Sequence, residues 1–534
     1  MSSLIKGTAI LTLGLFLSKI LGVIYIIPFY SMVGEDNIGL YQYAYIPYNL
    51  MLALAISGAP IAFSKFTAKY NSLGDYETGR RLLKSGLLTM MVTGFVAFLL
   101  LYLFAEPLAR ITISEDERIY SVGDVTEAIR WVSFALIVVP FMSLWRGFFQ
   151  GYNYMMPTAV SQLVEQIVRI IFLLGGAFAV IYIFGGTPKT AIQFAVLSAA
   201  VGALGGIVTL AYFWKKKKPE YNRLLANSVE SYDVKLRDMY KEIAIYAVPV
   251  IFLGIANPLF QFVDLMTFNR AMSSGGNFSE IDLLGILNLT AHKLVMIPVM
   301  LATGFSMALI PLITKHFTRN EHLQVSRTLD QSIQVLLFLT LPAVIGMTML
   351  SDELYHVFYE VSDVGSEILA HYLPVAILFA AFPVTASILQ GINKQKWIII
   401  NLTIGLLLKW MLNTPLIERF ETDGAIAATI IGYLVAIGMN MLVIVKTMNY
   451  RSQMVGRRVI LIVILNLIMA GAVYLVMSGL DLFIGMDNKF LSLLRITLIG
   501  GVGALVYGYL GLKTGLAQKL LGSKITRISR KLGF

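Results

Sequence analysis

Five charged side chains lie deep within the apolar segments of this 534-residue chain, and they are the residues whose types could do chemistry. On insertion scales, a charge at the centre of a membrane helix costs roughly 2.5–3.5 kcal/mol, so such a residue faces a partner, a ligand or a water-filled cavity. Positive groups outnumber negative ones in this set. That excess predicts the non-covalent binding of an anion by Lys19, Glu165, Arg169, Lys293 and Lys409.

Lys293 is the strongest candidate of the five. It lies in a long apolar segment that includes the stretch Leu287–Pro311 and can cross a bilayer. A lysine can extend its amine to the membrane interface along an apolar surface, but Lys293 is distant in sequence from both ends of this segment. We interpret it as a binding residue. An interfacial lysine and a private ion pair are the alternatives that the sequence leaves open.

Glu165 and Arg169 are spaced i, i+4, which places two side chains on one face of a helix. Their opposite charges predict a mutual ion pair. Asp264 lies nearer the outer end of its segment. Other charges close to segment ends are expected at the membrane interface, and these are Arg130, Arg146, Asp330 and Arg495.

The composition is that of an all-α polytopic membrane protein. Hydrophobic residues make up 57% of the chain and charged residues 14%, with a mean hydropathy of +0.75, whereas a soluble domain carries about 25% charge. The lack of cysteine excludes disulfides and thiolate metal sites. No glycine-rich phosphate loop is present, which argues against direct ATP hydrolysis. The net charge of +11 is expected at cytoplasmic loops and lipid head groups rather than at nucleic acid.

The sequence predicts fourteen transmembrane helices with both termini in the cytoplasm. The count follows from the length of the apolar segments, at about 20 residues per crossing. The orientation follows from the loops, since Lys and Arg gather in alternate ones such as 64–84, 215–241 and 314–327. Asp and Glu predominate in the opposite loops, which is the positive-inside pattern. The expected segments are 8–33, 38–63, 83–105, 127–150, 157–185, 190–214, 242–268, 282–313, 328–350, 366–391, 396–417, 424–446, 458–479 and 490–512.

An internal repeat groups these helices into two lobes. Gln150-Gly151-Tyr-Asn opens the fifth segment and Gln390-Gly391-Ile-Asn opens the eleventh, and at the same spacing Arg169 falls on Lys409. A run from Pro60 likewise resembles a run from Pro311. Repeated halves are typical of secondary transporters. The expected organisation is an N-lobe over 1–214, a basic linker over 215–241, a C-lobe over 242–446, a helix pair over 447–512 and a basic tail over 513–534.

Two basic regions predict contacts with anionic membrane lipids. Lys215–Lys218 follows the sixth segment, and the tail Lys513–Phe534 carries six basic and no acidic residues. Apolar residues recur along the tail at near-helical spacing, which is the pattern of an amphipathic helix on the inner leaflet. An ordinary solvated tail is the alternative.

Carboxylates gather in the loop expected outside, at Asp352, Glu353, Glu360, Asp363 and Glu367. A membrane glycosyltransferase could use such a pair. An acidic, lysine-poor outer loop is, however, the ordinary counterpart of the positive-inside pattern, so we expect no enzyme.

Several longer runs carry a family resemblance: Ser18–Gly22, Lys65–Thr78, Arg146–Gly151, Pro157–Arg169 and Leu389–Lys396. They resemble the MurJ-type lipid flippases of the multidrug/oligosaccharidyl-lipid/polysaccharide (MOP) exporter superfamily. Within it, the similarity is to the Gram-positive branch named YtgP, which is related to the sporulation protein SpoVB. The resemblance covers nearly the whole chain.

The resemblance implies a transporter of the bacterial plasma membrane that moves lipid II, an undecaprenyl-pyrophosphate-linked disaccharide-pentapeptide, from the inner to the outer leaflet. The cationic positions of the family fall on Lys19 and Lys293. The chain departs from Gram-negative relatives, which carry further arginines, at Tyr25 and near Leu52. Some relatives bind sodium between helices seven, eleven and twelve.

Asp264 and Asn413 are therefore candidate ligands for Na+, and the membrane potential is the other expected source of coupling. The expected mechanism is alternating access between two lobes of a monomer, without a chemical step. Rival functions are a flippase for another polyprenyl-linked glycan, of capsule or spore, and a cation-coupled drug exporter. The exporter should have an acidic cavity, whereas the deep charge here is basic.

Overall fold

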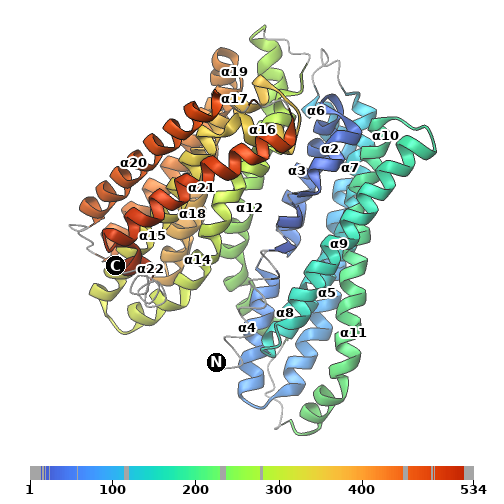
Figure 1. Ribbon diagram of the computed structural model, residues 1–534. Coiled ribbons are helices and arrows are strands. Elements are labelled where there is room, and N and C mark those ends of the chain that lie inside the picture. The colour runs from blue at the N-terminus through green and yellow to red at the C-terminus, as the bar shows by residue number, and fades with distance from the viewer. Residues whose placement is uncertain are drawn as a thin grey trace. The chain divides into compact units, whose positions relative to one another are not determined.

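The computed structural model describes residues 14, 17–18, 20–22, 24–56, 58–113, 120–228, 236–276, 281–448, 455–482, 485 and 488–521 (Figure 1). Every regular element in these ranges is helical, so the all-α class is confirmed. Twelve of the helices are long and apolar enough to cross a membrane. Apolar segments take this form in lipid because a helix satisfies its backbone hydrogen bonds within itself.

The chain divides into two compact units, Met1–Gly285 and Ile286–Phe534. Figure 1 draws the first from blue to green and the second from yellow-green to red. The boundary lies after the helix Leu236–Ser274, which packs on the first unit. The predicted lobes, which would assign that helix to the C-lobe, describe a sequence repeat rather than a contact boundary and stay a prediction.

The first unit is a bundle of helices joined by short turns. Its elements are α2 (Ile26–Val33), α3 (Glu35–Ile56), α4 (Ala59–Ser72), α5 (Tyr76–Leu103), α6 (Ala105–Thr112), α7 (Val122–Ser133), α8 (Ala135–Gly151), α9 (Met156–Phe178), the π-helix η1 (Ala179–Ile183), α10 (Pro188–Val196), α11 (Ser198–Ala226), α12 (Leu236–Ser274) and α13 (Leu283–Gly285).

The second unit begins with a π-helix and ends with a short amphipathic turn. Its elements are η2 (Ile286–Ala291), α14 (His292–Thr318), α15 (His322–Met349), α16 (Ser351–Phe358), α17 (Asp363–Tyr372), α18 (Val375–Gly391), α19 (Gln395–Met448), α20 (Val455–Asp481), α21 (Lys489–Lys513) and α22 (Leu516–Leu521).

The predicted segment 38–63 is broken into α3 and α4 at Gly58, which has φ 81°. A left-handed backbone favours glycine because it has no Cβ. Space also requires glycine there, since an added Cβ would lie 2.7 Å from the Ala247 carbonyl oxygen of α12. The break therefore lets α12 pack closely on the second crossing.

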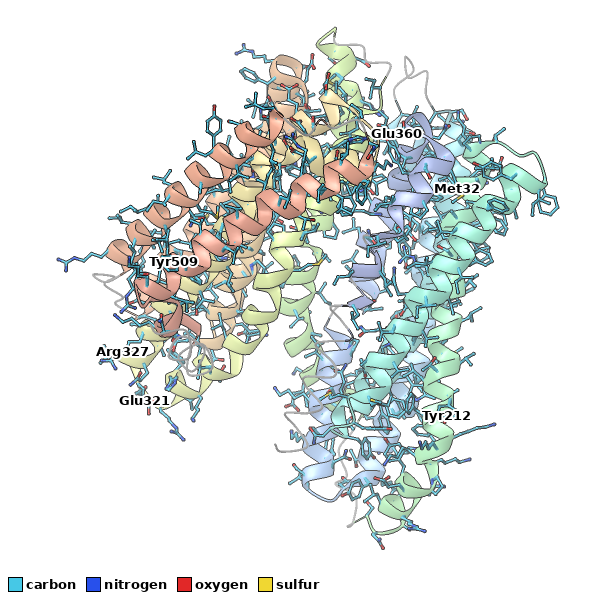
Figure 2. All side chains as sticks on the ribbon, viewed as in Figure 1. Met32, Tyr212, Glu321, Arg327, Glu360 and Tyr509 are labelled. Atoms are coloured by element: carbon cyan, nitrogen blue, oxygen red, sulfur yellow. The ribbon has the colours of Figure 1, made fainter. Side chains whose placement is uncertain are left out.

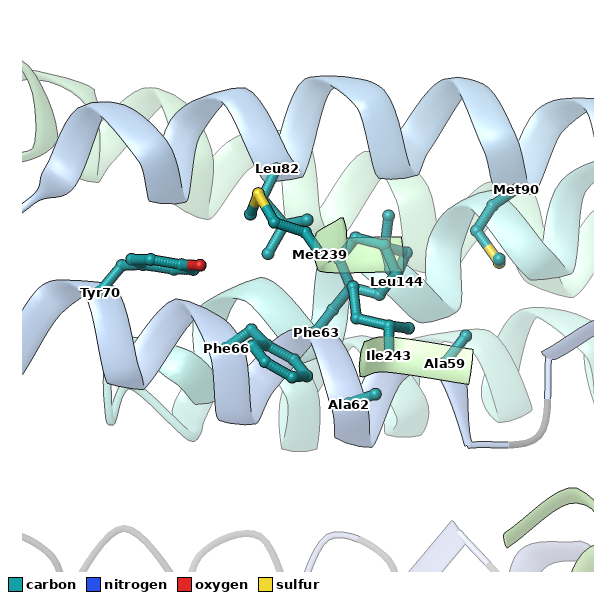
Figure 3. Close-up of a cluster of buried hydrophobic side chains, with 10 residues drawn as sticks. All are labelled: Ala59, Ala62, Phe63, Phe66, Tyr70, Leu82, Met90, Leu144, Met239 and Ile243. Carbon is teal, nitrogen blue, oxygen red and sulfur yellow. The ribbon is translucent and has the colours of Figure 1, made fainter. Parts of the chain in front are cut away.

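An apolar cluster holds the start of α12 against α4 and α5 (Figure 3). Met239 and Ile243 of α12 are 1% and 5% exposed and lie among Phe63, Phe66 and Leu82. Beside the cluster, the Tyr240 hydroxyl lies 3.0 Å from the Thr89 hydroxyl. This burial explains why α12 belongs to the first unit, although the sequence repeat assigns it to the second lobe.

Two predicted segments, 396–417 and 424–446, lie together in α19, which departs from helical geometry at Glu421 (φ 51°, ψ −125°). Side chains before and after this point meet in antiparallel order. Asn401 contacts Asn440 and Lys409 contacts Thr429. The element is therefore a helical hairpin that contains both predicted segments.

The internal repeat is visible in the backbone of two turns. Asn153 and Asn393, which follow α8 and α18, both have φ 57°. Gly74 and Asn320, which follow α4 and α14, also have positive φ. The second pair is 246 positions apart, whereas the Pro60 run matches the Pro311 run at 251 positions. The sequence match between those two runs is thus out of register by five residues.

Charged loops lie at opposite ends of the second unit, as Figure 2 shows for its labelled residues. Glu360 lies at one end, and Glu321 and Arg327 lie at the other. The start of the basic tail packs on protein: Leu516 and Leu520 of α22 are 2% and 5% exposed. The remainder of the predicted amphipathic tail, 522–534, lies outside the described residues.

Candidate anion-binding site

Arg169 of α9 is held by tyrosines of α3. Its Nη2 donates to the Tyr45 hydroxyl at 2.6 Å and to the Tyr41 hydroxyl at 3.1 Å. The guanidinium also lies over the Tyr45 ring, 5.3 Å from its centroid. The Tyr41 and Tyr45 rings stack at 4.2 Å because the residues are one helical turn apart. The Tyr25 hydroxyl, 3.2 Å from that of Tyr41, extends this polar cluster.

The Arg169 side chain is partly exposed, and its buried Nε has no hydrogen-bond partner among the described residues. A guanidinium offers paired N–H groups that match the oxygens of a phosphate or carboxylate. Its tyrosine partners are neutral and hold it in place without cancelling its charge. This arrangement can bind an anion.

Glu165 does not pair with Arg169, and that prediction was wrong. Its carboxylate accepts from Arg146 Nη2 at 2.7 Å, while Arg146 Nε donates to the Ser161 hydroxyl at 2.8 Å. Arg146 is 9% exposed, and the interfacial position expected for it stays a prediction. The i, i+4 rule predicts contacts within one helix, whereas α8 packs beside α9 and supplies a nearer cation.

Lys293 is the second residue of α14 and is half-buried. It lies about 15 Å along the helix from Leu283, the first residue of its span, at 1.5 Å per residue. Half the thickness of a bilayer core is also about 15 Å. Lys293 is thus an interior residue of the candidate span Leu283–Met300, and its depth in a membrane stays a prediction.

The π-helix η2 ends two residues before Lys293, and all six of its residues are buried. Its wider turn is held from outside: the Tyr359 hydroxyl donates to the Thr290 carbonyl at 2.9 Å, and the Tyr355 hydroxyl lies 3.1 Å from the Thr290 hydroxyl. Single π-turns inside helices are frequent at functional sites. A π-turn changes the angle at which the side chains after it project from the helix, and Lys293 is one of the residues that follow it here.

Asp282 anchors the chain just before this span. Its carboxylate accepts from the Gly285 backbone N–H at 2.8 Å and from the Tyr120 hydroxyl at 3.1 Å. The side chain is 7% exposed, and burial raises the pKa of Asp282 to about 6 although both hydrogen bonds oppose that rise. An ordinary aspartate has a pKa near 3.9. Burial in the protein therefore favours the neutral form of this carboxyl group.

Lys409 is fully buried within the α19 hairpin. Its Nζ donates to the Thr429 hydroxyl at 2.6 Å. Unlike Arg169, it offers no exposed surface to a ligand in this structure. Its predicted role as a substrate contact stays a prediction.

The remaining predicted residues are Lys19, Asp264 and Asn413. Lys19 lies outside the described residues. Asp264 is 4% exposed in α12 of the first unit, and Asn413 is fully buried in α19 of the second. Among the described residues, no group of three His, Cys, Asp or Glu side chains could hold a metal ion.

Glu353, one of the five clustered carboxylates, is taken up by an ion pair. Glu353 is 2% exposed and accepts from Arg495 Nε at 3.0 Å and Nη2 at 2.8 Å. Arg495, which is 3% exposed, also pairs with Asp481, and its expected position at the membrane interface stays a prediction. The pairing fastens α21 to α16. It also removes one carboxylate from the set that a glycosyltransferase would need.

The tyrosines around Arg169 were missed by the sequence reasoning. The signal that could have found them is the run Tyr41-Gln-Tyr-Ala-Tyr45-Ile-Pro-Tyr48, because so many hydroxyls within a predicted membrane segment require partners. His292, whose Nδ1 lies 3.0 Å from the Tyr372 hydroxyl, was likewise not connected with its neighbour Lys293.

Comparison with known proteins decides the family. Residues 4–317 match the family described as "Polysaccharide biosynthesis protein", and residues 286–489 match "Lipid II flippase MurJ". The chain is 43% identical to "Lipid II flippase MurJ" of Bacillus subtilis (strain 168) over 99% of both chains. The chain belongs to the MurJ family of lipid II flippases. With twelve candidate spans, this MurJ-family chain is a multi-pass protein of the bacterial plasma membrane, in a transporter family rather than an enzyme family.

More distant relatives show how far the fold extends beyond MurJ. "Stage V sporulation protein B" of Bacillus subtilis (strain 168) is 24% identical over 76% of each chain. A solved structure titled "Lipid II flippase MurJ, inward closed conformation" superposes with a TM-score of 0.65 at 16% identity, covering 96% of this chain and 99% of that one. An inward-facing MATE-family multidrug transporter gives 0.64 at 16% identity, covering 81% and 94%. At such identities, the two structures show the MurJ- and MATE-like fold alone.

Proposed function

We propose that this MurJ-family chain moves lipid II from the inner to the outer leaflet. The observation that carries the proposal is the 43% identity to a named lipid II flippase over nearly the full length of both chains. A half-buried lysine midway through a span agrees with it, because lipid II carries a pyrophosphate. No bond is made or broken in this process.

The proposed topology has fourteen crossings with both termini in the cytoplasm. The α19 hairpin supports two crossings where one long element is counted. Residues 8–33, of which only part is described, would supply the first crossing. The opposite placement of Glu360 and Arg327 in the second unit agrees with acidic loops outside and basic loops inside (Figure 2).

The proposed cycle is alternating access in a monomer. Lys293 and Lys19 attract the pyrophosphate, and Arg169 contributes its guanidinium. A lysine acts on phosphate as a point charge, whereas an arginine adds paired hydrogen bonds. An inside-negative potential favours the inward return of an unloaded cationic site by about 2.3 kcal/mol per charge per 100 mV. The potential is therefore the proposed driving force for resetting.

Anionic lipids are the proposed partners of the cytoplasmic end of α11. Lys215, Lys216 and Lys218 are exposed. Nearby cations rest on aromatic rings, with Arg80 4.6 Å from the Trp214 centroid and Lys217 5.2 Å from the Tyr154 centroid. Basic residues beside interfacial aromatics suit phosphodiester head groups.

The lipid partner is tested by reconstituting the protein in liposomes with and without phosphatidylglycerol. The protein is then purified again, and the lipids that it retains are measured. Replacing Lys215, Lys216 and Lys218 together with Ala should reduce anionic-lipid retention several-fold. Arg110→Ala, in a loop expected outside, is the control and should retain lipid normally. Equal retention of anionic lipid by both variants would show that these three lysines do not bind it.

The flippase proposal is tested with Lys293→Ala in a strain that depends on this protein and in proteoliposomes loaded with lipid II. A charged hydrogen bond contributes about 1.5–3 kcal/mol, so outward display of lipid II should fall by roughly tenfold to a hundredfold. Lys315→Ala, an exposed lysine at the other end of α14, is the matched control. Normal display by the Lys293 variant at equal protein level would exclude this residue from the site.

Depletion separates the remaining rivals. Lipid II that accumulates in the inner leaflet together with arrested wall growth supports the proposal. Loss of capsule or spore polysaccharide with normal lipid II display would support the other polyprenyl-linked glycans instead.

A further inference from the structure

Lys409 carries its charge into the interior of the second unit. The side chain has 0% exposure, and Nζ donates to the Thr429 hydroxyl at 2.6 Å. That hydroxyl donates its own proton to the Ala425 carbonyl at 2.9 Å. The Thr429 oxygen therefore acts as an acceptor toward Nζ, as it would toward a cation.

Asn413, a candidate sodium ligand from the family resemblance, lies one helical turn after Lys409 and is also 0% exposed. Residues at i and i+4 have Cβ atoms about 5–6 Å apart on one face of a helix. The lysine and the amide that would have to coordinate the ion thus lie on the same face of one helix, and both are buried. Three helical turns before Asn413, another pair of amides crosses the hairpin: Asn401 Nδ2 donates to Asn440 Oδ1 at 2.8 Å, and Asn440 Nδ2 donates to the Thr385 hydroxyl at 3.2 Å.

We propose that the Lys409 ammonium is a built-in cation that takes the place of a bound sodium ion beside Asn413, and that this chain therefore works without sodium at this position. The residues present do not fit the metal. Sodium is a hard cation that needs several oxygens turned toward it, and a covalently attached ammonium already takes the Thr429 oxygen.

Electrostatic repulsion opposes the binding of a sodium ion close to the Lys409 ammonium. Two like unit charges about 6 Å apart repel each other strongly enough, at an effective dielectric constant near 20, to weaken binding on the order of a hundredfold. Solvent screening is small at a fully buried site. A sodium ion beside Asn413 would therefore bind far more weakly than it would beside a neutral residue at position 409.

The binding test uses the purified full-length protein and does not depend on its substrate. Thermal unfolding is measured in sodium chloride and in potassium chloride at equal ionic strength, over a titration of sodium. Anything that binds only the folded state raises the unfolding midpoint. The proposal expects the same midpoint in both salts. A saturable rise in sodium that Asn413→Ala abolishes would overturn it.

A variant that lacks the ammonium is expected to gain sodium binding. Lys409→Asn removes the ammonium and keeps a side-chain oxygen, so it should acquire a sodium-dependent rise that the wild type lacks. Lys396→Met, which neutralises an exposed lysine of the same helix, is the matched control and should behave like the wild type. The wild-type titration decides the proposal even where Lys409→Asn fails to fold.

The transport consequence rests on the proposed function and is measured separately. Lipid II display in proteoliposomes should be the same within twofold when potassium replaces sodium. No lipid II display in either salt would count against the flippase proposal and leave the ion titration standing. Display that requires sodium would overturn the inference about Lys409 and leave the flippase proposal intact.

Discussion

Arg169 and Lys409 occupy equivalent positions of the internal repeat but have become different kinds of site. Arg169 is partly exposed, and two phenolic hydroxyls and a ring face hold it. Lys409 is fully buried and donates to a threonine hydroxyl. The charged residue is partly accessible at position 169 and fully buried at position 409.

The difference follows from what packs beside each residue. Arg169 extends from α9 toward the tyrosines of α3, a separate helix. Lys409 is covered by the returning half of its own hairpin, because Glu421 turns the chain back on itself. A repeat therefore preserves the position of a cation along a helix, while the neighbouring helix decides whether the cation can meet a ligand.

The largest effect that would test this comparison is on stability. Thr429→Val removes the hydroxyl that accepts from Lys409, and it leaves a buried charge with one partner fewer. Breaking such a contact should lower the free energy of unfolding by about 2–4 kcal/mol. The measurement is the shift of the unfolding midpoint in detergent.

Thr403→Val is the matched control, since this threonine is exposed on the same hairpin and donates only to the Ile399 carbonyl. It should change stability by less than about 0.5 kcal/mol. Equal losses in the free energy of unfolding for the two threonine variants would show that the contact between Thr429 and Lys409 does not stabilise the hairpin.

A smaller effect is expected at the glycines that bring the helices together. An added Cβ at Gly405 would lie 2.4 Å from the Gly432 carbonyl oxygen, and one at Gly202 would lie 2.8 Å from the Glu165 carbonyl oxygen and from Arg169 Cβ. Overpacking costs about 1–3 kcal/mol, and alanine returns up to about 1 kcal/mol of helix propensity. Gly405→Ala should therefore destabilise the protein by about 2 kcal/mol and Gly202→Ala by about half as much.

The two glycine variants are compared by thermal unfolding, with Gly438→Ala as the control because nothing lies within 4 Å of its added Cβ. That control should be neutral or slightly stabilising. A larger cost at Gly202 than at Gly405 would reverse the view that the Lys409 hairpin is the tighter of the two.

The class of the fold could be predicted from the sequence because apolar length and loop charge report directly on membrane crossings. The depth of the charges stays a prediction, although Lys293 lies within a candidate span, Leu283–Met300. Depth follows from position along one helix and needs no knowledge of neighbouring helices.

Partners could not be predicted, because they depend on which helices become neighbours. Glu165 faces Arg146 of α8 rather than Arg169, and Arg495 meets Glu353 across 142 positions of sequence. The break at Gly58 was missed as well, since the close approach of α12 that favours glycine there involves a residue far along the chain. Local spacing rules carry no information about such contacts.

The smallest expected effect concerns the hydroxyls around Arg169. Tyr45→Phe removes the acceptor at 2.6 Å but keeps the ring under the guanidinium, the Tyr41 hydroxyl and partial access to solvent. The free energy of unfolding should fall by only about 0.5–1.5 kcal/mol, less than for Thr429→Val. Tyr48→Phe, which keeps the edge contact with Tyr45, serves as the control. If removing the Tyr45 hydroxyl cost as much as removing that of Thr429, Arg169 would be as internal as Lys409, and the contrast between a presented and an enclosed cation would fail.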